Sequence, residues 1–221
     1  MPRPLDGPRL PPKSGTTKQL VVFLHGYGAD GNDLIDLGQS WAPILPDCAF
    51  VSPHAPEPCA GSPTGRQWFG LTFRDPDERW NGCVKAAPDL DALLDQELAR
   101  LGLGPDNLAL VGFSQGTMMA LHVGLRRKVA PASIVGFSGH LVRPERLAED
   151  ATAKPPVLLI HGDQDQVLPV DMMFEAAEGL AKAGIPAEWH LSRGIGHGID
   201  QGGLIHGGSF LAQRFGLKLP A

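Results

Sequence analysis

Five residues constrain the fold of this chain more than any other stretch: Gly112-Phe113-Ser114-Gln115-Gly116, a G-x-S-x-G pattern. A largely apolar run, residues 107–111, precedes it, and a stretch with helical character, residues 117–123, follows it. A serine placed between a strand and a helix sits on a strained turn that lifts its Oγ clear of the sheet. The two flanking glycines let strand and helix approach closely, because a Cβ at either position would clash. The pattern predicts a nucleophile elbow, with the N-terminus of the helix facing any negative charge that develops beside Ser114.

A hydroxyl is a weak nucleophile at neutral pH, so an elbow needs a base and an acid that orients the base. In the fold that uses this elbow, the three groups follow in the order serine, acid, histidine. Two downstream turns meet this demand, one at residues 161–169 and one that contains His197. We predict that Asp165 accepts a hydrogen bond from Nδ1–H of His197, and that His197 is the general base toward Ser114. Asp163, in the same turn as Asp165, is the alternative acid.

The rest of the chain alternates between strand-like and helix-like segments. Continuous apolar runs such as residues 19–24 are typical of parallel strands that are buried on both faces. We expect strands at residues 19–24, 48–51, 132–137, 156–160 and 187–191, and helices at residues 32–41, 89–101, 170–183 and 201–215. This alternation predicts an α/β fold with a mostly parallel central sheet and helices on both faces.

We expect a single domain over residues 1–221, because no linker or repeat interrupts the alternation. Residues 1–18 are rich in Pro and Gly and are predicted to run over the surface, with room for a short strand pair. Residues 53–83 are predicted to form a long loop over the rim of the site. A loop of that length inside a compact domain is usually functional.

Composition excludes several classes of partner. The formal net charge of -5, with no basic run, argues against nucleic acid and anionic membrane surfaces. No stretch approaches the ~18 uninterrupted apolar residues of a membrane span. The N-terminus lacks the apolar region of a secretory signal, so we expect a cytoplasmic protein. The sequence leaves the oligomeric state open, and a homodimer is compatible with it.

The cysteines and histidines give no sign of a metal site. Cys48, Cys59 and Cys83 are an odd number without C-x-x-C spacing, which favours reduced thiols. Cys48 is expected in the core, and pairing of Cys59 with Cys83 is left open. Neither metal-binding histidine spacing nor a dinucleotide motif is present, so we expect no metal and no organic cofactor. His25 and His161 are expected to brace turns, and the surface or packing histidines are His54, His122, His140, His190 and His206.

Four motifs together resemble the phospholipase/carboxylesterase family of α/β-hydrolases, which includes acyl-protein thioesterases and small bacterial carboxylesterases. They are Leu24-His25-Gly26-Tyr27-Gly28-Ala29-Asp30, the G-x-S-x-G segment, residues 161–169 and Gly196-His197. The resemblance covers about residues 18 to 215. It implies the triad Ser114, Asp165 and His197, and an oxyanion hole made by the backbone N–H groups of Tyr27 and Gln115.

Two residues depart from the pattern of the family. Tyr27 stands where relatives usually carry Leu, and Thr117 where many carry Gly. A backbone donor survives either change, but the ring of Tyr27 would narrow the acyl side of the pocket. Trp68-Phe69 resembles an aromatic pair of the family beside the acyl site. We hypothesise that Trp68, Phe69, Leu71 and Phe73 line an apolar acyl channel; the alternative is that they anchor the long loop to the core.

The sequence therefore predicts a serine hydrolase that cleaves short- to medium-chain carboxylic esters through an acyl-enzyme. The small-molecule substrate is an ester or a thioester, since the same triad would serve a thioesterase, a lysophospholipase or an enzyme that deacylates lipidated proteins. An acyltransferase or a peptidase would also use these three groups. A hydrolase-fold binding protein without catalysis is the alternative from another class, and such proteins usually lack a triad member.

Overall fold

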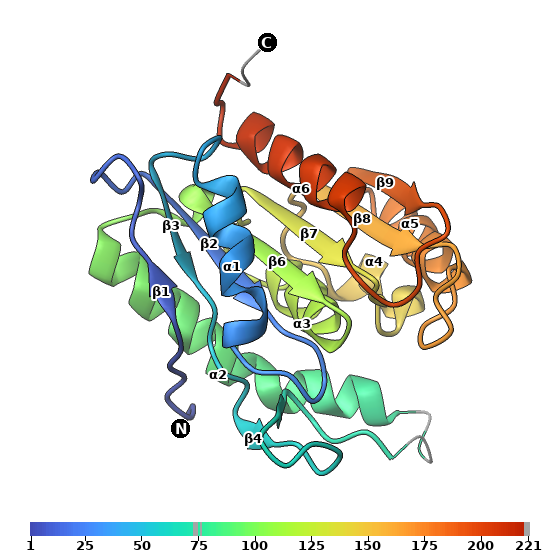
Figure 1. Ribbon diagram of the computed structural model, residues 1–221. Helices are drawn as coiled ribbons and strands as arrows, with labels where there is room; N and C mark the ends of the chain where they lie inside the picture. Colours follow the sequence, from blue (N-terminus) through green and yellow to red (C-terminus); the bar gives the residue numbers. More distant parts are fainter. Residues whose placement is uncertain (73–74, 76, 219–221) are drawn as a thin grey trace.

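The computed structural model describes residues 1–72, 75 and 77–218. Its centre is a seven-stranded sheet in the order β1-β3-β2-β6-β7-β8-β9 (Figure 1). The pairing of β1 with β3 is antiparallel, and the other five pairings are parallel. The strands are β1 Arg9–Leu10, β2 Gln19–Leu24, β3 Cys48–Val51, β6 Leu108–Phe113, β7 Ser133–Phe137, β8 Val157–Gly162 and β9 Ala187–Ser192. The predicted α/β-hydrolase architecture, a mostly parallel sheet with helices on both faces, is confirmed.

Each face of the sheet carries its own hydrophobic core. Along β2, Leu20, Val22 and Leu24 belong to one core, which also contains residues of α2, α3 and α5. Val21 and Phe23 point to the other face, where they pack with α1 and α6. Figure 1 shows these two groups of helices on opposite sides of the sheet. Both faces are therefore buried, which explains why β2 is apolar at successive positions rather than alternate ones.

Most helices lie where the periodicity of the sequence predicts them. They are α1 Asn32–Trp41, α3 Gln115–Gly124, α5 Asp171–Lys182 and α6 Gln201–Arg214. Three short helical turns complete the fold: η1 Pro105–Asn107, η2 Pro144–Arg146 and α4 Leu147–Asp150. Within the described residues, no helix is both long and apolar enough to cross a membrane.

The start of the second helix differs from the prediction. Helix α2 spans Glu78–Leu101 and runs through Pro88, so the predicted start at residue 89 is wrong and the loop ends before residue 83. Gly82 and Pro88 are poor helix formers, so the local signal for this half of the helix is weak. Tertiary packing outweighs it. Cys83 and Ala86 are buried in the core, and the missing Cβ of Gly82 leaves room for an aromatic ring from the loop.

The loop before α2 contains a small two-stranded sheet, β4 Glu57–Pro58 with β5 Arg66–Gln67. The three cysteines are free thiols, so the open alternative of a bond between Cys59 and Cys83 is excluded. Cys48 is fully buried in the core, as predicted.

The N-terminal lead-in forms one strand, β1, rather than a strand pair, and this strand extends the edge of the main sheet beside β3. Two ion pairs fasten the segment to α2. Arg3 Nε lies 2.8 Å from Asp89, and Arg9 Nη2 lies 2.7 Å from the buried carboxylate of Glu97. Buried carboxylates need such partners, so this surface segment has a fixed path.

Candidate active site

Ser114 occupies the sharp turn between β6 and α3. Its φ of 54° and ψ of -116° lie outside the regions that residues with a side chain ordinarily adopt. A hydrogen bond from its N–H to the carbonyl oxygen of Phe137, at 2.9 Å, helps to hold this conformation. Backbone strain of this kind persists only where the surroundings enforce it, and it concentrates at functional sites.

The two glycines of the elbow are required by close backbone approach, as the sequence predicts. A Cβ on Gly112 would clash with the backbone of Gly116 and Thr117, and a Cβ on Gly116 would clash with the carbonyl oxygen of Leu24 in β2. Backbone atoms cannot swing aside as the end of a long side chain can. The elbow therefore packs tightly against both its own helix and the neighbouring strand.

Asp165 and His197 form a hydrogen-bonded pair. Nδ1 of His197 lies 2.7 Å from Oδ2 of Asp165. The other carboxylate oxygen accepts from the N–H groups of Val167 and Leu168, both at 2.9 Å. Burial by itself would raise the pKa of Asp165, but the hydrogen bonds from Leu168, His197 and Val167 together hold that pKa below its usual value. The carboxylate therefore stays ionised and can orient the imidazole.

Asp163, the alternative acid, has a different partner. Its Oδ1 accepts from the N–H of Gly194 at 2.6 Å, which ties together the turns after β8 and β9. Gly162 allows this contact, because a Cβ there would clash with the carbonyl oxygens of Ile195 and Gly196. The turn that carries His197 thus packs directly on the end of β8, and Asp165 is the carboxylate that faces the imidazole.

The imidazole also lies beside the elbow. The ring of His197 is 4.9 Å, centroid to centroid, from the ring of Phe113, the residue before Ser114. The side chain of His197 is 19% exposed, and Ser114 is half-buried, so both are open to a ligand. An alcohol, an imidazole and an ionised carboxylate therefore lie at the same carboxyl edge of the sheet, and these are the three kinds of group that a serine triad combines.

The two predicted oxyanion donors belong to segments that adjoin the serine. Gln115 is the first residue of α3, and Tyr27 lies in the turn after β2. A Cβ built on Gly26 would be 3.4 Å from Cβ of Ser114, so this turn touches the elbow. Among the residues that the structure describes, the N–H groups of Tyr27 and Gln115 have no hydrogen-bond acceptor. Both remain free to bind an oxygen, and the helix dipole of α3 would favour negative charge there.

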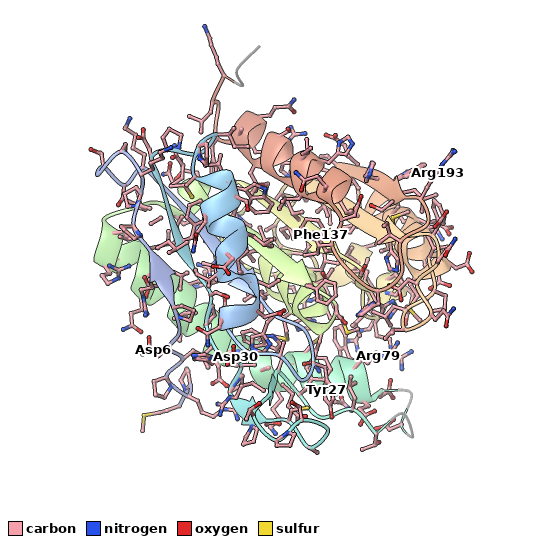
Figure 2. The ribbon with its side chains drawn as sticks, in the orientation of Figure 1. Asp6, Tyr27, Asp30, Arg79, Phe137 and Arg193 are labelled. Atoms are coloured by element: carbon pink, nitrogen blue, oxygen red, sulfur yellow. The ribbon has the colours of Figure 1, made fainter. Side chains whose placement is uncertain are left out.

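The ring of Tyr27 packs on the turn at residues 59–61. A Cβ on Gly61 would lie 3.4 Å from the ring, and a hydrogen bond with the Cys59 thiol raises the pKa of the phenol. In Figure 2, Tyr27 and Arg79, which lies in the first turn of α2, are on the same lower side of the molecule.

The four residues predicted to line an acyl channel lie in different places. Trp68 and Phe69 are 1% and 2% exposed and belong to the core with α2 and α3. These contacts agree with the alternative in which the aromatic pair anchors the loop. Leu71 is partly buried against the same core, so its role at the channel stays a prediction. Phe73 lies outside the described residues.

The Gln115 side chain has a role that the sequence did not predict. Its Oε1 accepts from the N–H of Trp68 at 2.9 Å, and its Nε2 donates to the carbonyl oxygen of Phe69 at 2.8 Å. The amide is 1% exposed, and a buried amide normally has such partners. The signal in the sequence was a glutamine at the start of a mostly apolar helix.

Thr117, the other departure from the family pattern, packs against two glycines. Its side chain fills the space that Gly136 and Gly139 leave open, and its Oγ1 donates to the carbonyl oxygen of Phe137 at 2.9 Å. Thr117 therefore supports the same carbonyl that accepts from the N–H of Ser114.

Three other histidines have structural contacts. Nε2 of His161 is 2.8 Å from the carbonyl oxygen of Leu168 and braces the turn that carries Asp165. His190 on β9 and His206 on α6 lie with ring centroids 4.0 Å apart and ring planes tilted by 35°. No group of three or more His, Cys, Asp or Glu in the described part of the chain is placed to hold a metal ion.

The sheet and this site define the class of the protein: an α/β-hydrolase. The model of the phospholipase/carboxylesterase family matches residues 6–214, so the chain belongs to that family. The predicted enzyme class, a carboxylic ester hydrolase, is confirmed by this membership.

The chain is similar to proteins of known sequence and structure along most of its length. It is 31% identical to esterase YpfH of Escherichia coli (strain K12), over 83% of this chain and 77% of the relative. It is 28% identical to acyl-protein thioesterase 1 of Gibberella zeae, over 80% of this chain and 82% of the relative. The crystal structure of esterase PE8 superposes with a TM-score of 0.92 and 49% identity, covering 96% of this chain and 99% of the other.

Proposed function

We propose that this protein is a serine carboxylesterase that hydrolyses short- to medium-chain carboxylic esters through Ser114, His197 and Asp165. The observation that carries the proposal is the 2.7 Å contact between His197 Nδ1 and Asp165 Oδ2, beside a serine held at a strained strand-to-helix turn. Membership of the phospholipase/carboxylesterase family supports the reaction class.

In the proposed reaction, Nε2 of His197 removes the proton from the Ser114 hydroxyl as Oγ attacks the ester carbonyl. The carbonyl oxygen becomes an oxyanion that accepts hydrogen bonds from the N–H groups of Tyr27 and Gln115. The imidazolium then gives its proton to the departing alcohol, which leaves an acyl-enzyme on Ser114. Water repeats the sequence and releases the carboxylic acid.

Asp165 contributes by orientation and charge. Because its carboxylate accepts a hydrogen bond from Nδ1–H of His197, the unprotonated nitrogen of the neutral ring is Nε2. The same carboxylate stabilises the imidazolium that forms during each step. The two N–H groups that bind its other oxygen fix the direction of the carboxylate.

The proposed preference for short to medium acyl chains rests on the residues around the elbow. Tyr27 places a bulky ring in the turn after β2, and Leu71, in the loop before α2, is partly buried. A matched series of p-nitrophenyl esters measures this preference directly. A rate that rises steadily toward long-chain esters would contradict it.

Thioester hydrolysis is the second candidate, and the relatives named acyl-protein thioesterase 1 favour it. The triad chemistry is the same for both substrates, since only the leaving group changes. Esters and thioesters with the same acyl chain therefore discriminate between the two functions. A kcat/KM that is higher for the thioester at every chain length would favour the second candidate.

The central test uses Ser114→Ala. We expect this variant to lose hydrolysis and labelling by a serine-reactive fluorophosphonate, whereas Ser40→Ala, on the exposed side of α1, keeps both. Native wild-type protein that neither hydrolyses any ester or thioester nor takes up the label would instead support a hydrolase-fold binding protein.

We also propose that the protein works in the cytoplasm, which its three free thiols support. Sedimentation or light scattering would establish whether it is the monomer or the homodimer that the sequence allows.

A further inference from the structure

A buried hydrogen-bond network joins three segments around the elbow. Besides its contact with Gln115, Trp68 donates from its indole Nε1–H to the carbonyl oxygen of His25 at 3.0 Å. The loop residue therefore touches both the start of α3 and the turn after β2. His25, Trp68 and Gln115 are 0%, 1% and 1% exposed. A fully paired polar network in a buried region favours one arrangement over its alternatives.

His25 continues the network to the second oxyanion donor. Its Nε2 accepts from the N–H of Ala55 at 3.0 Å, so Nδ1 carries the proton and donates to the carbonyl oxygen of Gly26 at 2.8 Å. Burial lowers the pKa of His25, which keeps the ring in this neutral form. The carbonyl of Gly26 and the N–H of Tyr27 belong to one planar, trans peptide unit and point in opposite directions. The hydrogen bond that fixes the carbonyl therefore also fixes the direction of the N–H.

We propose that Trp68 is a positioning residue for the oxyanion hole. Because it bonds at once to the side chain of Gln115 and to the carbonyl of His25, it sets the spacing between the N–H groups of Gln115 and Tyr27. The inference rests on the proposed function and adds a residue that never touches the reacting atoms. Donors matter most once the oxyanion has formed, so a small misplacement lowers kcat more than it changes substrate binding.

Trp68 also fills the core, and a loss of packing must be separated from a loss of positioning. Trp41 supplies the matched control. It is 2% exposed, and its Nε1–H donates to the carbonyl oxygen of Leu204 at 2.9 Å. Replacing either tryptophan by Phe removes one indole and one hydrogen bond to a main-chain oxygen. Trp41, however, is the last residue of α1 and bonds to α6, on the other face of the sheet.

The experiment compares wild type, Trp68→Phe and Trp41→Phe in kcat, KM, thermal midpoint and inhibition by a trifluoromethyl ketone. Attack of Ser114 on this ketone gives a tetrahedral adduct with an oxyanion, so its affinity reports on the hole. For Trp68→Phe we expect kcat and ketone affinity to fall together by about tenfold, with KM within about twofold. Trp41→Phe is expected to lower the thermal midpoint alone.

The inference is overturned if Trp68→Phe, like Trp41→Phe, lowers only the thermal midpoint. If Trp68→Phe does not fold, Gln115→Met removes both side-chain bonds at similar volume, and the same paired loss is expected; unchanged kcat and ketone affinity in that variant would overturn the inference. An inactive wild type would overturn the proposed function and this inference with it, whereas an active wild type with an unaffected Trp68→Phe overturns the inference alone.

Discussion

Replacement of Asp165 by Asn gives the sharpest test of the catalytic geometry. Oδ1 of Asp165 accepts two backbone N–H groups in a buried turn. The carbonyl oxygen of an asparagine would stay there, because each donor left unpaired costs about 1–3 kcal/mol. The amide Nδ2 would then face Nδ1 of His197 and donate to it. This forces the imidazole proton onto Nε2, the nitrogen that must accept from Ser114.

The magnitude follows from that wrong tautomer. In a comparable triad the same change lowers kcat by about 10⁴, which corresponds to about 5 kcal/mol of transition-state stabilisation. The fold should persist, because the two backbone contacts remain. We expect kcat for a p-nitrophenyl ester to fall by this factor in Asp165→Asn, with a thermal midpoint close to that of wild type.

Asp163→Asn is the matched control. Its amide oxygen can still accept from the N–H of Gly194, and Asp163 has no hydrogen bond to His197, so we expect kcat within about twofold of wild type. The reasoning is refuted if Asp165→Asn keeps more than about one tenth of the wild-type kcat, or if Asp163→Asn loses as much activity as Asp165→Asn.

Two further predictions concern stability. Gly116→Ala places a Cβ against the carbonyl oxygen of Leu24, so the free energy of unfolding measured in urea should fall by about 2 kcal/mol or more. Gly70→Ala, where the nearest atom is 3.5 Å away, should change it by less than about 0.5 kcal/mol, and equal losses would contradict the packing argument. Burial lowers the pKa of His122 to about 4. His122 is therefore protonated at a higher pH in the unfolded chain than in the folded protein. As the pH falls from about 6.5 to 4, this difference lowers the free energy of unfolding by about 3 kcal/mol. In His122→Leu, the free energy of unfolding measured in urea should depend less on pH between about pH 6.5 and 4. A pH dependence equal to that of wild type would contradict this role of His122.

Local patterns were sufficient to predict the order of strands and helices. The continuous apolar run of β2 and the helical spacing of Leu34, Ile35 and Trp41 in α1 report burial through local pattern, which needs no knowledge of distant partners. The elbow was equally local, because one serine and two glycines within five residues specify a strained turn. The rule for the chain order of the triad then led to the two turns that carry Asp165 and His197.

The choice between two carboxylates in one turn could not be made from local patterns. Asp163 and Asp165 are two residues apart, and both follow β8. The close packing of residues 195–196 on Gly162 directs one carboxylate to Gly194 and the other to His197. That packing depends on two turns that the sequence keeps well apart.

Contacts between distant segments also decided the start of α2 and the place of Trp68. The sequence by itself determined the strand and helix order, the strained serine turn and the turn that carries His197, because each leaves a pattern within a few neighbouring residues. Only the tertiary structure decided which carboxylate meets the imidazole, and that a loop tryptophan bonds to both turns beside the serine. Hydrogen bonds between remote segments depend on how the helices and the sheet pack together, and this packing has no pattern among neighbouring residues of a sequence.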